Sequence, residues 1–144
     1  MLGNDRDGAR IYALSRLTVA FIWLYHGLVP KLLAADPDEA ALLRAAGLAP
    51  QHVTTLIHAI GLAEIVFGVA LLAAWRARWL FGITILLMIA ALALVAVGSP
   101  GYLTRAFNPV TLNIATIALS VIGLLSGKRM RDATRTPGPF GDKV

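Results

Sequence analysis

The sequence predicts an all-α membrane protein, an antiparallel bundle of four transmembrane helices. Four long apolar blocks run through the 144-residue chain, and a helix needs about 20 apolar residues to cross a bilayer. Only 15% of the residues are charged, against about 25% in soluble domains, and the mean hydropathy is +0.73. The predicted order is a polar tail at 1–10, a transmembrane domain at 11–127 with spans at about 11–29, 53–74, 80–97 and 109–126, and a basic, disordered tail at 128–144.

The first block is interpreted as an uncleaved transmembrane helix. Its predicted end is at Val29, because Pro30 cannot continue the helical hydrogen-bond ladder and biases the preceding residue away from helix. A cleaved signal peptide is the alternative, since small residues follow at 34–35. Trp23 and Lys31 are unusual around the apolar part of a signal peptide, which favours the transmembrane helix.

A short surface helix is predicted at about 37–46, on the extracytoplasmic side between the first two spans. Asp36 is its expected N-cap, Pro37 occupies the first helical position, and Glu39 completes a capping box. Gly47 is placed to end this helix. The segment is either a plain connector at the membrane surface or a lid over the mouth of the bundle.

The last two spans differ in chemistry. The span at 80–97 has no charged residue and is predicted to be the helix most exposed to lipid. The span at 109–126 begins with Asn108 as N-cap and Pro109 at the first helical position. A stripe of small and hydrogen-bonding side chains runs along it at helical spacing and predicts a packing face: Asn113, Thr116, Ser120 and Gly123.

Lysine and arginine residues indicate the orientation in the membrane. Nine of them lie in the two tails and the 75–78 turn, against three in the loops on the other side. Both termini are therefore predicted to be cytoplasmic, in the cell (inner) membrane. The lipid bilayer thus accounts for the net charge of +5, and no motif indicates a nucleic-acid partner. The nine are Arg6, Arg10, Arg76, Arg78, Lys128, Arg129, Arg131, Arg135 and Lys143, and the three are Lys31, Arg44 and Arg105.

Glu64, near the middle of the second span, organises the predicted bundle. An ionised carboxylate at mid-bilayer costs roughly 2.5–3.5 kcal/mol, so it must face protein, water or a partner. Gly61 and Gly68 share its face of the helix and allow another backbone to approach closely. Arg16 lies about 6 Å from Glu64 in depth, at 1.5 Å per residue, which predicts an Arg16–Glu64 ion pair. The alternative is that Arg16 extends to the near membrane surface.

A polar site inside the bundle is predicted around this pair, with Glu64 and His26 as candidate catalytic groups. His26 and His58 lie at similar depth on neighbouring spans and are weak candidates for axial haem ligands, but their helical faces diverge, so haem is not expected. No metal site is expected, because helix capping explains the acidic residues at 36–39. The predicted polar site comprises Arg16, Trp23, His26, Lys31, Glu64, Asn108 and Asn113.

Three stretches, in this order, resemble the DoxX-like family of four-helix bacterial membrane proteins. They are RLTVAFIWLYHGLVPKLL at 16–33, GLAEIVFGVALL at 61–72 and AFNPVTLN at 106–113. The resemblance implies a membrane subunit of a redox complex, because the wider DoxX/DoxD group includes the membrane subunit of a thiosulfate:quinone oxidoreductase and a membrane partner in oxidative-stress complexes. The residues that look like the family's polar signature are Arg16, His26, Lys31, Glu64 and Asn108.

Three functional hypotheses follow. The first is a quinone-linked membrane subunit, in which histidine and glutamate hydrogen-bond the quinone head group and move protons, with a soluble or membrane oxidoreductase subunit as partner. The second is a non-catalytic membrane scaffold, and the third is a binder or carrier of a small lipid-like or anionic molecule; a homo-oligomer is compatible with each. The chain has no cysteine, which excludes a thiol–disulfide mechanism carried by it. Hydrolysis is not expected, since the motifs G-x-S-x-G, H-E-x-x-H and the P-loop do not occur.

Overall fold

The computed structural model describes residues 2–34, 36–104 and 108–135, and all the regular secondary structure within them is helical. Four helices are long and apolar enough to cross a membrane, which confirms the four predicted spans. They cover Arg6–Leu33, Pro50–Ala73, Trp79–Gly98 and Pro109–Lys128. The elements in order are α1 (Leu2–His26), the π-helix η1 (Gly27–Leu33), α2 (Pro37–Ala45), α3 (Pro50–Ala73), α4 (Trp79–Gly98), the 3-10 helix η2 (Pro100–Thr104) and α5 (Pro109–Arg135).

The helices extend further than their apolar blocks. α1 begins at Leu2, inside the predicted polar tail, and α5 continues to Arg135, through the first part of the tail predicted to be disordered. The remainder of that tail, 136–144, lies outside the described residues. Helical hydrogen bonds thus continue along the backbone beyond the point where the side chains cease to be apolar.

The first span does not end before Pro30. It continues to Leu33 as the π-helix η1, in which the N–H of Ala34 donates to the carbonyl of Val29, five residues back, at 2.8 Å. A proline ring normally clashes with the carbonyl four residues before it, and a π-turn, with its wider i to i+5 bonding, changes that spacing. The helix therefore accommodates Pro30 by a change of helix type.

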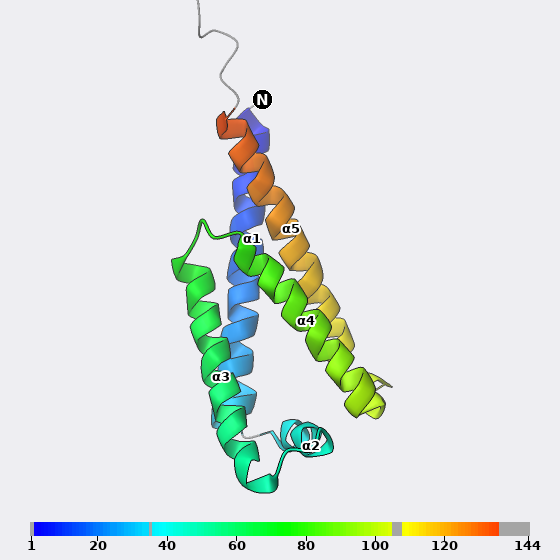
Figure 1. Cartoon of the computed structure of the whole chain (residues 1–144). Coiled ribbons are helices and arrows are strands. Elements are labelled where there is room, and N and C mark those ends of the chain that lie inside the picture. The colour runs from blue at the N-terminus through cyan, green and yellow to red at the C-terminus, as the bar shows by residue number, and fades with distance from the viewer. Residues whose placement is uncertain (1, 35, 105–107, 136–144) are drawn as a thin grey trace, which may run out of the picture.

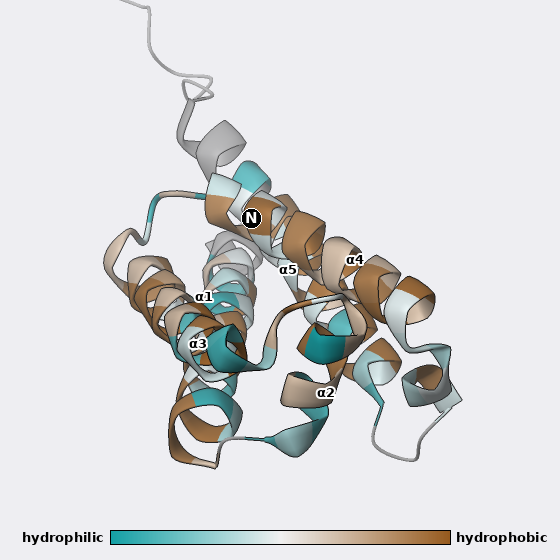
Figure 2. Ribbon diagram, turned by 60° about the horizontal axis from the view of Figure 1, so that its bottom comes forward, coloured by the Kyte–Doolittle hydropathy of each residue, from teal (hydrophilic) through white to brown (hydrophobic). Residues whose placement is uncertain are grey.

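α1 lies in the middle of the bundle, where it packs against both α3 and α5, while α4 packs against α5 (Figure 1). α3 and α4 are joined by a short turn but diverge from it, and α2 lies across the end of the bundle far from the N-terminus (Figure 1). Hydrophobic residues cover most of α4 (Figure 2), and Leu86 and Val97 are among its exposed side chains. The bundle is thus two packed helix pairs that open toward α2.

Glycines bring the first span and α3 into close contact. A Cβ added to Gly27 would meet the backbone oxygen of Gly61, and one added to Gly61 would lie 2.8 Å from the backbone oxygen of Gly27. A Cβ at Gly68 would lie 2.8 Å from Leu24 Cγ. Side chains at these positions would push the helices apart, so the two backbones touch because glycines face each other.

Arg16 is fully buried where α1 passes the end of α3. Its Nε donates to the carbonyl of Leu71 at 2.5 Å, its Nη1 donates to the carbonyl of Ala77 at 3.3 Å, and its Nη2 donates to the carbonyl of Ala74. The last carbonyls of a helix have no partner within it, so the guanidinium group supplies a donor to Leu71 at the end of α3. It adds a second donor to the carbonyl of Ala74, which also accepts from the N–H of Ala77. The rings of Tyr12, Trp75 and Phe81 surround Arg16, with centroids 5.5–5.7 Å from its Cζ atom.

The predicted Arg16–Glu64 ion pair is wrong. Both residues are described, and the carboxylate of Glu64 pairs with a different cation. Because Gly61 lies against Gly27, Glu64 is level with about residue 24 of α1. Eight residues, or about 12 Å, separate that level from Arg16. The side chain of Arg16 also points toward the N-terminus of its helix, away from Glu64.

Replacing Arg16 with alanine should lower the free energy of unfolding by about 1–3 kcal/mol for each buried carbonyl that loses its donor. Arg16→Lys should recover only part of the loss, because a single ammonium group lacks the planar fork of donors. Reversible unfolding in lipid nanodiscs measures both variants. Arg10→Ala, at an exposed position of the same helix, is the control and should change stability by less than about 0.5 kcal/mol. Equal losses in the two alanine variants would contradict the anchoring role of Arg16.

Candidate functional site

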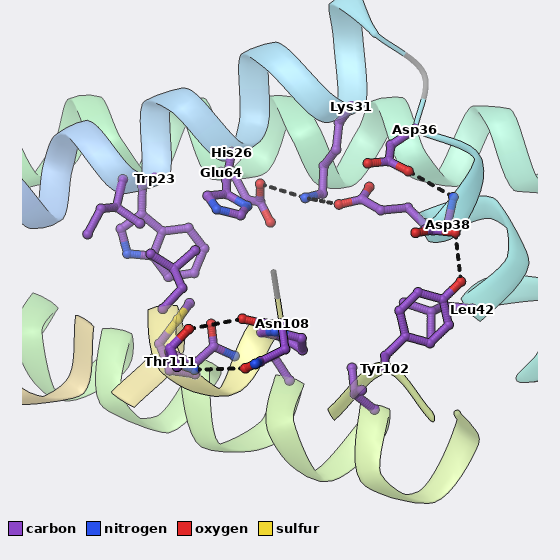
Figure 3. A pocket seen from close by; sticks show the side chains of 18 residues that line it. Trp23, His26, Lys31, Asp36, Asp38, Leu42, Glu64, Tyr102, Asn108 and Thr111 are labelled. Carbon is purple, nitrogen blue, oxygen red and sulfur yellow. Dashed lines mark hydrogen bonds and ion pairs between the residues drawn. The ribbon is translucent and has the colours of Figure 1, made fainter. Parts of the chain in front are cut away.

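A cavity of about 560 Å³ lies at the α2 end of the bundle. Its walls come from α1 and η1, α2, α4 and α5, and a single residue of α3, Glu64, completes the lining (Figure 3). Apolar side chains make up much of the wall: Ile22, Leu42, Met88, Val95 and Leu112. Polar side chains from distant parts of the sequence face the same space, so the cavity is amphipathic.

Lys31 is the buried cation of this cavity. Its Nζ lies 2.8 Å from Glu39 Oε1 and 3.1 Å from Glu64 Oε2, and its side chain is only 8% exposed. It donates a hydrogen bond to Glu39, whereas the buried Oε2 atom of Glu64 has no hydrogen-bond partner of good geometry among the described residues. One ammonium group thus sits between two carboxylates, and Glu64 keeps unused acceptor capacity.

Carboxylates are frequent among the described residues that line the cavity. Asp36, Asp38, Glu39 and Glu64 line it together with Lys31. A buried ammonium or carboxylate group is costly unless it is paired and hydrogen-bonded: Lys31 pairs with Glu39 and Glu64, and Asp36 and Asp38 accept hydrogen bonds from the N–H of Asp38 and the hydroxyl of Tyr102. Ionised carboxylates can only accept, so this wall can bind groups that carry a proton.

α2 is fixed across this end of the bundle by its first turn. Asp36 caps the helix, as predicted, by accepting a hydrogen bond from the N–H of Asp38 at 2.8 Å. Tyr102 in η2 donates its hydroxyl to Asp38 Oδ1 at 2.9 Å. Glu39, which the sequence assigned to a capping box, pairs with Lys31 instead. The acidic turn thus joins α2 to η1 and to η2 through side chains, as Figure 3 shows.

The other predicted polar residues also line the cavity. Trp23 donates its Nε1 hydrogen to Thr84 Oγ1 at 3.2 Å and forms a T-shaped contact with Phe67, so it is a fixed part of the wall. Asn108 accepts a hydrogen bond from the N–H of Thr111 at 3.1 Å, as expected of an N-cap.

His26 and Asn113 complete this group. Asn113 is only 8% exposed, and its side-chain amide makes no hydrogen bond to another residue in the described part of the chain. Since buried amide groups normally have partners, Asn113 offers a donor and an acceptor to whatever occupies the cavity. His26 lies beside Glu64 in the same space (Figure 3).

Of the seven residues in the predicted site, the cavity brings together all except Arg16. Sequence reasoning did not assign Asp38, Glu39 and Tyr102 to the site. Asp38 and Glu39 were explained by their positions in a helix cap. The predicted cap could have indicated that they belong to the site, because a helix placed over the bundle brings its first-turn carboxylates to the cavity. Nothing in the local sequence of Tyr102 indicates Asp38 as its partner.

His58 does not share the cavity with His26. It lines a second space of about 280 Å³ between α2 and α3, together with Arg44 and Thr54. The two histidines proposed as weak haem ligands thus face separate spaces. Among the described residues, no group of three or more histidine, aspartate or glutamate side chains is placed to hold a metal ion.

Lys31→Met should destabilise the protein by at most about 3–5 kcal/mol, because it leaves two partly buried carboxylates without their cation. Adding Glu64→Gln should restore part of that loss, since it removes one of the unpaired charges. The measurement is a double-mutant cycle on the free energy of unfolding, with an expected coupling of about 0.5–3 kcal/mol. Lys128→Met, at an exposed lysine, is the control. Additive effects of the Lys31 and Glu64 changes would show that the Lys31–Glu64 ion pair contributes no coupling free energy to stability.

Comparison with known proteins identifies one family. The DoxX-like family matches the chain over residues 20–121, a range that includes α3, α4 and η2 and most of the cavity lining. No match is found among curated proteins or among solved structures. The four membrane-crossing helices and the family match agree, and the match covers more than half of the chain. The chain is an integral membrane protein that belongs to the DoxX-like family.

Proposed function

We propose that this DoxX-like protein is the membrane subunit of a quinone-linked redox complex, and that its cavity receives the quinone head group. The observation that carries the proposal is the amphipathic cavity itself, which combines apolar walls with polar groups from separate helices. Its volume of about 560 Å³ falls in the range of ligand cavities, about 300–1,000 Å³.

The two polar walls suit a flat ring with oxygen atoms at its opposite ends. Lys31, His26 and Glu64 stand on one wall, and Asn108 and Asn113 on α5 stand on the other. A quinone head group needs a hydrogen-bonding group near each oxygen, and these walls supply one set each. Trp23 and Met88 are apolar surfaces on which the ring can pack.

A lipid-soluble ligand also needs a route from the bilayer. α3 and α4 diverge from their connecting turn (Figure 1), and α3 contributes only Glu64 to the cavity lining. A head group in the cavity can therefore keep its tail among lipid chains between these helices.

The proposed placement is an antiparallel bundle in the inner membrane with both termini in the cytoplasm. Arg6, Arg10, Arg76 and Lys128 are exposed in α1, α5 and the α3–α4 turn, and a concentration of positive charge favours the cytoplasmic side. The cavity and α2 then lie toward the other face. The basic end would face a soluble oxidoreductase subunit, which is the partner that this proposal requires.

Two neighbouring alanines of α4 allow a matched test. Ala91 lines the cavity, while Ala90 is exposed on the outside of the helix. Ala91→Phe should fill the space and Ala90→Phe should leave it open. The ligand is a benzoquinone with a decyl chain, supplied in both redox forms to purified protein in nanodiscs, and the readout is the unfolding temperature as a function of ligand concentration.

The wild-type protein and Ala90→Phe should show the same ligand-dependent rise in unfolding temperature. In Ala91→Phe the concentration needed for that rise should increase at least about tenfold, as expected when a well-fitted apolar cavity is overfilled. If neither redox form stabilises the wild-type protein, the proposed function fails. An unchanged response in Ala91→Phe would place the ligand outside this cavity.

A further inference from the structure

We infer that the cavity selects the reduced, hydroxyl-bearing form of its head group, a hydroquinone, over the oxidised quinone. This inference rests on the proposed function and adds to it which of the two redox forms is bound. It follows from the hydrogen-bonding groups that face the cavity and from those already engaged by partners within the protein.

The strongest hydrogen-bonding groups at the cavity are acceptors. Glu64, Glu39, Asp36 and Asp38 are carboxylates, and an ionised carboxylate can only accept hydrogen bonds. Glu64 forms one ion pair, at 3.1 Å, and its buried Oε2 atom lacks a hydrogen-bond partner of good geometry among the described residues.

Several strong donors at the cavity are already engaged within the protein. Lys31 contacts Glu39 and Glu64, Trp23 donates to Thr84, and Tyr102 donates to Asp38. A quinone can accept from the third hydrogen of the Lys31 ammonium group, but it has no hydrogen to donate to Glu64. A hydroquinone can accept from the same donor and also donate to Glu64, so it satisfies a group that the quinone leaves without a donor.

Asn113 provides the second hydrogen-bonding point. Its amide is nine-tenths buried, lines the cavity on the α5 wall and has no partner in the described residues. An amide oxygen accepts and an amide NH₂ group donates, so Asn113 can satisfy the second hydroxyl of the ring. The geometry thus offers a carboxylate at one end of the head group and an amide at the other.

The carboxylate of Glu64 also disfavours anionic ligands. A carboxylate or phosphate head group placed beside Glu64 would meet a group of like charge.

Three matched ligands test the inference on the wild-type protein, so the test does not depend on the folding of a variant. They are decyl-hydroquinone under anaerobic reducing conditions, decyl-quinone, and the dimethyl ether of decyl-hydroquinone, which has the same ring but no hydroxyl hydrogen. A hydrogen bond to a charged group corresponds to about tenfold or more in affinity. The hydroquinone should therefore bind at least about ten times more tightly than either of the other two.

Glu64→Gln should reduce this preference to a few-fold or less, because a neutral amide is a weaker acceptor than a carboxylate. Asp7→Asn, the same change of charge at an exposed residue of α1, should retain the full preference. Equal affinity for the three ligands, or tighter binding of the quinone, overturns the inference and leaves binding in the cavity intact. Loss of all binding in the wild-type protein overturns the proposed function and the inference together. A full preference in Glu64→Gln would remove Glu64 from its assigned role.

Discussion

A lysine held between two carboxylates fixes the geometry of the whole α2 end of the protein. Lys31 belongs to η1, Glu64 to α3 and Glu39 to α2, so one ammonium group joins three segments. Each of these charges would be costly alone in a membrane-embedded bundle, and each is tolerated because the others are present. The interaction therefore holds α2 across the bundle and keeps a charged wall beside an apolar one.

Much of the architecture could be predicted from the sequence because a bilayer restricts what a chain can do. Apolar blocks of sufficient length must become helices, since lipid offers no partner for backbone groups. The glycines beside Glu64 indicated a close helix contact, which Gly61 makes with Gly27. The polar stripe on the fourth span indicated a packing face, and Thr116 and Ser120 are fully buried. In each case the information was local to one helix.

The pairing of charges could not be predicted in the same way. A helical wheel shows which residues share a face, but it does not show how far one helix is shifted along another. Arg16 was therefore assigned to Glu64, although it lies about 12 Å away in depth and binds the carbonyls at the end of α3. The donors of Arg16 are taken up by carbonyls of the protein itself. Lys31 was assigned to the polar site, but its pairing with Glu39 depends on the position of α2 and its pairing with Glu64 depends on the shift of α3 along the first span.

The π-helix at Gly27–Leu33 determines which way Lys31 faces. In an α-helix, residues five apart are separated by about 140° around the axis, so His26 and Lys31 would point in different directions. Bonding from i to i+5 stacks residues five apart instead, and both side chains reach the same cavity. The number of residues in this segment is therefore as strict a requirement as the identities of Gly27 and Lys31. The loss of one residue would turn the lysine away and leave both acidic groups without a cation.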